Sequence, residues 1–176
     1  DITAATRQPL YSGWEWRNKA DYESLISDLF EENEKMLGTE RLILRRWEDS
    51  DAEDLYKYAS DPDVGPIAGW PPHQSVYESR GVIKNVLSGK EAYAICLKED
   101  GIAIGAIELK LNGHTDMTDR DDECEMGYWL GKPFWGQGIM PEAVKEMLRH
   151  AFEDCGMQKV WIGYYAVSYT HLTLPT

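Results

Sequence analysis

The 176-residue sequence is poor in cysteine and has no long apolar run. Its three cysteines, Cys96, Cys124 and Cys155, include no Cys-x-x-Cys pair, and no two histidines have the spacing of metal ligands. No apolar run approaches the roughly 18 residues that a membrane-spanning helix needs, and no segment has the pattern of a signal peptide. We therefore expect a reduced, cytoplasmic protein with no metal ion and no membrane partner.

Positive charge is also scarce, since 18 Lys and Arg residues stand against 31 Asp and Glu residues and the net charge is −13. A nucleic-acid partner requires a basic face, so none is expected. An acidic surface suits a cationic substrate, although it more often serves only solubility. Both interpretations stay open for one acidic run of the sequence. Its members are Asp116, Asp119, Asp121, Asp122, Glu123 and Glu125.

Hydrophobic patterns predict an α+β fold with a mixed sheet and the element order β-α-α-β-β-β-α-β. The last strand–helix–strand unit should be parallel and right-handed, whereas the strands before it form hairpins. We expect helices on both faces of this sheet. The predicted strands cover 40–47, 92–98, 102–111, 123–130 and 159–165, and the predicted helices cover 50–60, 75–89 and 141–154.

Particular residues mark where these helices begin. Ser50 with Glu53, and Ser75 with Glu78, have the spacing of capping boxes. Pro141 suits the first position of its helix, where a missing N–H costs nothing. Three prolines in 65–73 predict a loop without regular structure.

Three parts of the chain differ in pattern. Residues 1–38 are interpreted as an N-terminal helical extension, because apolar side chains recur at helical spacing in 21–31. The main domain is expected at 39–165. Residues 166–176 form a polar, Thr-rich tail with no core pattern of its own.

A glycine-rich turn precedes the predicted helix 141–154. Gly136 and Gly138 lack a Cβ, so an anion can approach the main chain at the helix N-terminus. Glycines before a helix are also typical of a plain turn. A Walker loop would require Lys-Ser/Thr after Gly138, and a Rossmann fingerprint would require glycine at Pro141. Of the nucleotide-binding motifs compared, the acyl-CoA turn, Gln/Arg-x-x-Gly-x-Gly/Ala, remains. Trp135 and Met140 depart from this motif, but neither substitution removes a main-chain amide that could bind a diphosphate.

Four motifs in order resemble the GNAT superfamily of N-acetyltransferases, in its Rim-type branch of ribosomal-protein alanine N-acetyltransferases. They are Thr39-Glu40-Arg41-Leu42-Ile43-Leu44-Arg45, Gly69-Trp70-Pro71-Pro72-His73, Glu125-Met126-Gly127-Tyr128-Trp129-Leu130 and Phe134-Trp135-Gly136-Gln137-Gly138-Ile139-Met140-Pro141-Glu142-Ala143.

The resemblance implies the acyl-CoA N-acyltransferase (GNAT) fold and acetyl-CoA as co-substrate. The pantetheine arm would lie where strand 123–130 splays from strand 159–165, and the diphosphate would lie on the turn. The acetyl-CoA-binding residues implied in this way are Tyr128, Trp129, Leu130, Trp135, Gly136, Gln137, Gly138, Ile139 and Met140.

The resemblance also implies that an amine, on a protein N-terminus or a small molecule, attacks the thioester directly without a metal. The amine must arrive neutral, so a base or a water relay is needed. Glu125 is the candidate base, with the alternative that it is a surface carboxylate that only favours an incoming cation. Glu108, on the preceding strand, is the reserve candidate. His73 is a candidate residue of the acceptor cleft, with the alternative that it is only a turn residue. The sequence leaves the oligomeric state open.

Relatives in this family continue past the last predicted strand with a loop, a helix and two more strands. The tail 166–176 resembles none of these, so we expect a chain truncated at the C-terminus. The principal hypothesis is an N-acetyltransferase. An alternative is a catalytically impaired acyl-CoA-binding or interaction module, and a third is a nucleotide-binding domain.

Overall fold

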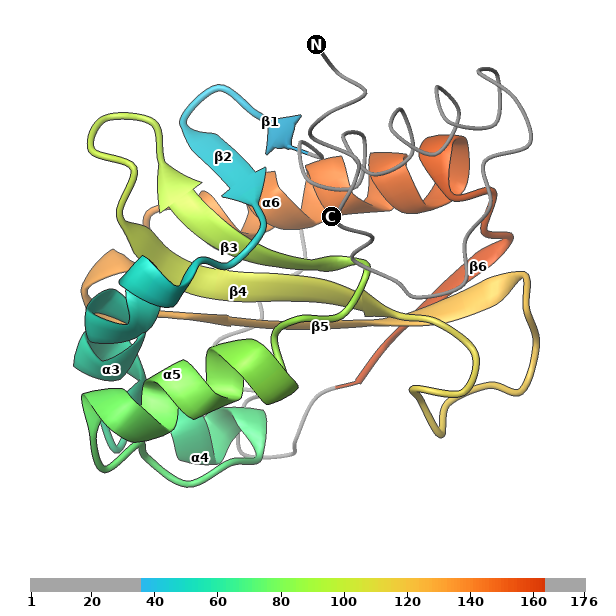
Figure 1. Cartoon of the computed structure of the whole chain (residues 1–176). Helices are drawn as coiled ribbons and strands as arrows, with labels where there is room; N and C mark the ends of the chain where they lie inside the picture. The colour runs from blue at the N-terminus through green and yellow to red at the C-terminus, as the bar shows by residue number, and fades with distance from the viewer. Residues whose placement is uncertain (1–35, 164–176) are drawn as a thin grey trace, which may run out of the picture. The chain divides into compact units, whose positions relative to one another are not determined.

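Six strands form one sheet in the part of the chain that the computed structural model describes, residues 36–163 (Figure 1). Their order in the sheet follows their order in the chain, with every neighbouring pair antiparallel except the last, β5 and β6, which is parallel. The mixed sheet is therefore confirmed. The strands are β1 (Leu37–Gly38), β2 (Leu42–Arg45), β3 (Ala92–Leu97), β4 (Ala103–Lys110), β5 (Glu123–Leu130) and β6 (Lys159–Ile162).

Helices cover both faces of the sheet, as predicted: α6 lies on one face, and α3, α4 and α5 lie on the other (Figure 1). The helices are α3 (Ala52–Ala59), α4 (Gly65–Ala68), α5 (Val76–Asn85) and α6 (Ile139–Arg149), with 3₁₀ turns η1 (Asp49–Asp51) and η2 (Lys132–Phe134) and a π-helical turn η3 (His150–Asp154). No helix within residues 36–163 has the length and apolar character needed to cross a bilayer.

Strand β3 shows how the sequence divides the core between the two faces. Tyr93 and Ile95 are fully buried in the cluster that includes Met147 of α6. Ala94 and Cys96, which alternate with Tyr93 and Ile95 along the strand, belong to another cluster on the opposite face. Successive residues of a strand point to opposite faces, so this apolar run fills two cores at once.

The first predicted capping box is wrong, because the chain becomes helical earlier than Ser50. The turn η1 is capped at Glu48, whose N–H donates to Asp51 Oδ2 at 2.8 Å. Asp51 is buried and also accepts two hydrogen bonds of 2.8 Å from the guanidinium of Arg45. One carboxylate thus joins β2 to the start of α3.

We expect Asp51→Asn to lower the free energy of unfolding by about 2 kcal/mol, since it leaves a largely buried guanidinium without its charged partner. Asp49→Asn is the matched control. The Asp49 side chain is 56% exposed and pairs with Arg80 at 3.0 Å on the surface, and such pairs contribute less than about 1 kcal/mol. Urea unfolding of both variants measures the difference. Equal losses would contradict the role assigned to Asp51.

The second capping box is confirmed in its first half. Ser75 Oγ accepts from the N–H of Glu78 at 3.1 Å, but the Glu78 carboxylate accepts from the N–H of Gln74 at 2.6 Å. The reciprocal bond is therefore shifted by one residue. The segment 65–73 is not wholly irregular, because Pro66 lies in the first turn of α4, where its missing N–H is not needed.

The helix predicted at 141–154 begins earlier than expected. Gly138 caps α6 with a φ of +73°, and Pro141 is the third helical residue, not the first. The N–H of that position also has no intrahelical acceptor, which is why proline is tolerated there. The helix continues as η3 to Asp154, and Gly156, with a φ of +68°, follows it.

Two strands differ by more than one residue from their predicted limits. The expected strand 40–47 is shorter as β2, and an additional strand, β1, pairs with it through Leu37 opposite Leu44. Strand β6 ends at Ile162. The helix predicted within residues 1–35 and the tail 166–176 lie outside the described residues.

Candidate functional site

Strands β5 and β6 are paired over only half of β5. Glu123–Met126 lie opposite Lys159–Ile162, whereas no described strand pairs with Gly127–Leu130 on that side. On its other side β5 is paired with β4 from Glu125 to Leu130, opposite Lys110 to Gly105. The carboxyl end of β5 is therefore held in place by one neighbour and has an open edge toward β6.

The main-chain groups at this edge can be assigned from the hydrogen bonds around it. The N–H of Gly131 donates to Ile104 O on β4 at 2.8 Å. Because direction alternates along a strand, the main-chain groups of Tyr128 and Leu130 point away from β4. The carbonyl of Leu130 accepts from Trp135 Nε1 at 2.8 Å. The N–H groups of Tyr128 and Leu130 thus face the open edge.

The side chains of this segment fall on both faces. Tyr128 packs with the cluster under α6, and burial raises its pKa above the usual value. Trp129 packs against the cluster of α3 and α5 on the opposite face. Both side chains pack on the faces of the sheet, so the groups exposed at the open edge of β5 are main-chain groups.

The glycine-rich turn lies immediately before α6. Gly136 and Gly138 both have a φ of +73°, a conformation that side chains rarely adopt. A Cβ added at Gly136 would meet nothing within 4 Å, and one at Gly138 would meet only Arg41 Nη2, at 3.6 Å. The first amides of α6, those of Ile139 and Met140, have no carbonyl one turn earlier in the helix. The turn therefore offers an open, donor-rich surface that suits a diphosphate.

Arg41 places a positive charge beside this turn. Its Nε lies 2.7 Å from Glu142 Oε2, and its Nη1 donates to Gln137 O at 3.0 Å. Burial opposes ionisation of Glu142, but hydrogen bonds from Thr39 and Arg41 outweigh it and lower the pKa of Glu142. Sequence reasoning gave Arg41 no role, although it lies in the first of the four motifs.

Glu108 and Glu125 lie on one face of the sheet, on either side of Lys110 Nζ. Lys110 Nζ is 3.3 Å from Glu125 Oε1 and 3.8 Å from Glu108 Oε1. Glu125 also accepts from Thr115 Oγ1 at 2.5 Å. Burial raises the pKa of Glu108 above its usual value, and Lys110 offsets part of this shift. The environment of Glu108 thus favours its protonated form.

The structure distinguishes the two glutamates by register as well. Glu125 is opposite Trp161, within the paired part of β5 and β6. Glu108 is opposite Gly127, the first residue of the open edge, and a Cβ at Gly127 would lie 3.3 Å from Glu108 Oε1. Because Gly127 has no side chain, the Glu108 carboxylate lies over the beginning of that edge.

The Trp-Pro-Pro-His segment packs against the same region. The ring of Trp70 contacts Trp129 edge-on, with centroids 5.7 Å apart, and lies 5.4 Å from the ring of His73. His73 Nδ1 is 2.8 Å from Ser79 Oγ of α5, and burial lowers the pKa of His73. His73 therefore has a defined packing position beside Trp70, which borders Trp129.

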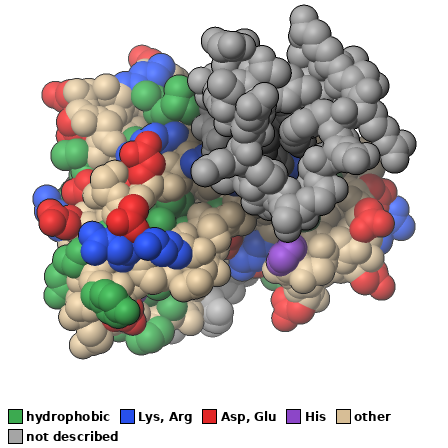
Figure 2. All heavy atoms as spheres, viewed as in Figure 1, with side chains coloured by type: hydrophobic (Ala, Val, Ile, Leu, Met, Phe, Trp, Pro, Cys, Tyr) green, Lys and Arg blue, Asp and Glu red, His purple; other side chains and the backbone are tan. Residues whose placement is uncertain are grey.

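Much of the predicted acidic run is paired. Asp122 receives two hydrogen bonds from Arg120, and Glu123 lies 3.2 Å from Lys159 Nζ. The indole of Trp161 donates to Glu123 at 2.7 Å and lowers its pKa. Basic and acidic side chains also lie next to one another on the face of the described part seen in Figure 2.

Comparisons with known proteins agree with this geometry. The family model described as "Acetyltransferase (GNAT) domain" matches residues 41–167. N-acetyltransferase p20 of Bacillus licheniformis, named as uncharacterized, is 31% identical over 129 residues, which is 70% of each chain.

Solved structures share the fold. An acetyltransferase (GNAT family) from Bacillus anthracis has a TM-score of 0.65 at 20% identity and covers 78% of each chain. RimL, a ribosomal L7/L12 alpha-N-protein acetyltransferase, has a TM-score of 0.56 at 19% identity over 73% of this chain and 70% of its own. The resemblance carried by the four motifs is thereby confirmed. The chain belongs to the GNAT family of acetyltransferases, which transfer an acetyl group from acetyl-CoA to an amine.

Proposed function

We propose that this chain acetylates the α-amine of a protein by direct attack of the amine on the thioester of acetyl-CoA. The observation that carries the proposal is the position of the open edge of β5, which begins opposite Glu108 and ends one short turn before the glycines that precede α6. The open edge and the turn that follows it therefore bring together a carboxylate, main-chain donors and a helix N-terminus that can accept an anion.

In this proposal the turn 135–140 holds the diphosphate through its main-chain amides, except that of Trp135, which donates to Lys132 O at 3.2 Å. Arg41 lies beside the turn. The N–H groups of Tyr128 and Leu130 hold the pantetheine arm as an additional strand would be held. One of these N–H groups also stabilises the oxyanion that forms when the amine attacks. No side chain forms a covalent intermediate.

We assign the base to Glu108 and give Glu125 the reserve position, which reverses the ranking from sequence alone. A general base works best when its pKa lies near the working pH, and the pKa of Glu108 is shifted in that direction. Glu125 is held by Thr115 and Lys110 and lies two residues further into the paired strands. Its hydrogen bonds suit it to fixing the first half of β5 and the loop that carries Thr115.

The choice of a protein amine over a small amine is supported by the printed function of RimL and by the acidic composition of this chain. A panel of unblocked peptides, N-acetylated control peptides and small amines tests it through thiol release from acetyl-CoA. Turnover confined to unblocked peptides is expected. Turnover with small amines alone would contradict the assigned acceptor, and acetyl-CoA binding without any turnover would favour the alternative of a non-catalytic acyl-CoA-binding module.

Arg41→Gln should raise the KM for acetyl-CoA about 10-fold while changing kcat little, because a cation beside the diphosphate contributes to binding. Arg80→Gln is the matched control, since the Arg80 side chain is 44% exposed against 45% for Arg41 and also forms an ion pair, with Asp49. Steady-state kinetics at varied acetyl-CoA concentration give both constants. If the two variants have the same KM, Arg41 takes no part in binding.

A further inference from the structure

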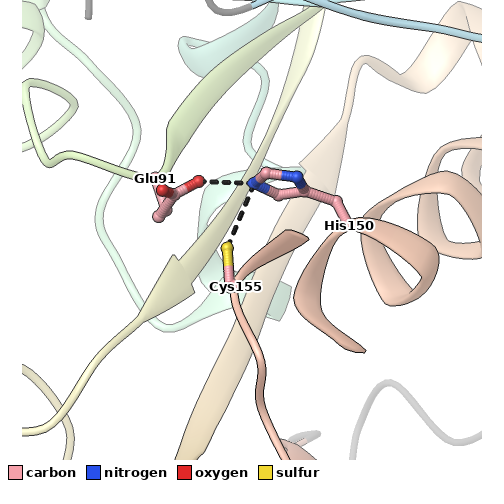
Figure 3. Close-up of side chains that lie close together, drawn as sticks. All are labelled: Glu91, His150 and Cys155. Atoms are coloured by element: carbon pink, nitrogen blue, oxygen red, sulfur yellow. Dashed lines mark hydrogen bonds and ion pairs between the residues drawn. The ribbon is translucent and has the colours of Figure 1, made fainter. Parts of the chain in front are cut away.

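A largely buried cluster of three potential ligands lies at the opposite end of α6 from the glycine-rich turn. Its members are Glu91, just before β3, His150, the first residue of η3, and Cys155, just after η3 (Figure 3). His150 Nε2 lies 2.8 Å from Glu91 Oε2 and 3.3 Å from Cys155 Sγ. Since α6 has 11 residues, about 16 Å of helix separates this cluster from the proposed diphosphate site.

The π-helical turn is what brings two of these side chains together. The N–H of Cys155 donates to His150 O at 2.9 Å, which closes a turn five residues wide. In a regular α-helix, residues five positions apart point in different directions, whereas the wider turn aligns them. Such turns are rare and occur frequently at functional sites.

We propose that Glu91, His150 and Cys155 bind a divalent zinc ion. Carboxylate oxygen, imidazole nitrogen and thiolate sulfur are the three ligand types that zinc takes in proteins. The three ligand atoms already lie within 4.8 Å of one another. Tetrahedral zinc, with bonds of about 2.0–2.3 Å, needs ligand atoms roughly 3.3–3.7 Å apart, so Glu91 and His150 must separate by less than about 1 Å.

Neighbouring side chains orient these ligands. Asp154 Oδ2 lies 2.7 Å from His150 Nδ1, which directs Nε2 toward Glu91 and Cys155. Asp154 is in turn held by Arg149 at 3.0 Å. The hydroxyl of Tyr93 donates to Glu91 Oε2 at 2.8 Å. Carboxylates that hold the second nitrogen of a histidine ligand are a regular feature of zinc sites.

Binding would replace the contacts that the three residues now make with one another. The Cys155 thiol would lose its proton to solvent, imidazole would bind in its neutral form, and water would take the fourth position. Cys155 is only partly buried and Asp154 is 42% exposed, so the cluster can be reached from the surface. This proposal departs from the expectation, based on sequence spacing, that the chain binds no metal.

Titration of the metal-free full chain with Co²⁺, followed by absorption spectroscopy, tests the proposal directly. We expect one equivalent of Co²⁺ to produce a near-ultraviolet thiolate-to-metal band and visible bands typical of tetrahedral coordination, and one equivalent of Zn²⁺ to abolish both. Cys155→Ser should remove the thiolate band and weaken Zn²⁺ binding at least ~100-fold, and Asp154→Asn should weaken it ~10-fold. Glu91→Gln should also weaken it.

Cys96→Ser is the matched control, because Cys96 is a buried thiol in the cluster on the opposite face of the sheet. It should leave the spectrum and the Zn²⁺ affinity unchanged, and circular dichroism verifies that each variant folds. Absence of the thiolate band in the unaltered chain would overturn the proposal. The proposal would also be overturned if Cys155→Ser left the affinity for Zn²⁺ unchanged, since the metal would then be bound by residues outside the cluster.

Discussion

Gly138→Val should weaken acetyl-CoA binding by about 100-fold, which corresponds to about 3 kcal/mol of binding free energy. The side chain would project from the residue that caps α6, where nothing except Arg41 Nη2 lies within 4 Å in the structure. The valine methyls would therefore occupy the surface that the diphosphate must approach. Isothermal titration with acetyl-CoA measures the loss.

Gly156→Val provides the matched control for backbone strain. Gly156 has a φ of +68°, close to the +73° of Gly138, and it follows the other end of the same helical segment. Each variant should lose roughly 1–3 kcal/mol of stability, because non-glycine residues are strained in this region. Only Gly138→Val should lose affinity for acetyl-CoA. Equal losses of affinity would mean that strain, and not blockage of the turn, is responsible.

Glu108→Gln should lower kcat by about 100- to 1,000-fold with little change in the KM for acetyl-CoA, as expected on removal of a general base. The base must be ionised to accept a proton. Because burial raises the pKa of Glu108, the acid limb of the kcat profile should lie at higher pH than for an ordinary glutamate. The limb should disappear in the variant. Rates measured from acid to neutral pH test both statements.

Glu125→Gln separates the two candidate bases. Its side chain shares Lys110 with Glu108 but lies in the paired part of β5 and β6. We expect a much smaller loss of kcat and an acid limb that is retained. A larger loss in Glu125→Gln than in Glu108→Gln would restore the ranking that the sequence alone favoured.

Local patterns predicted most of the fold. The apolar run of β3 and the stripe that buries Met147 specify their elements without knowledge of distant residues, so the eight predicted strands and helices occur in the predicted order, with β1 and α4 in addition. The glycine-rich turn is equally local, because a tight approach to main chain requires glycine wherever it occurs. Strand β1 was missed because its two residues owe their conformation to pairing with β2.

Features of the site that depend on distant contacts were not predictable. Arg41 and Glu142 are 101 residues apart in the sequence, and Glu91 and His150 are 59 apart. The preference for Glu108 over Glu125 arises from the raised pKa of Glu108 and from the point at which β6 ceases to pair with β5. No spacing in the sequence encodes either property. The start of α3 was misplaced for a local reason, since the N–H of Glu48 donates to Asp51, which the sequence analysis did not consider as a cap.

The central claim is that acetyl-CoA binds along the open edge of β5 with its diphosphate at the N-terminus of α6. Amide chemical shifts of the ¹⁵N-labelled full chain, recorded during titration with acetyl-CoA and separately with ATP and NAD, test it residue by residue. The account predicts saturable shifts at the amides of 135–140, Tyr128 and Leu130 with acetyl-CoA alone. Shifts confined to other segments, or the same shifts with ATP or NAD, would contradict it.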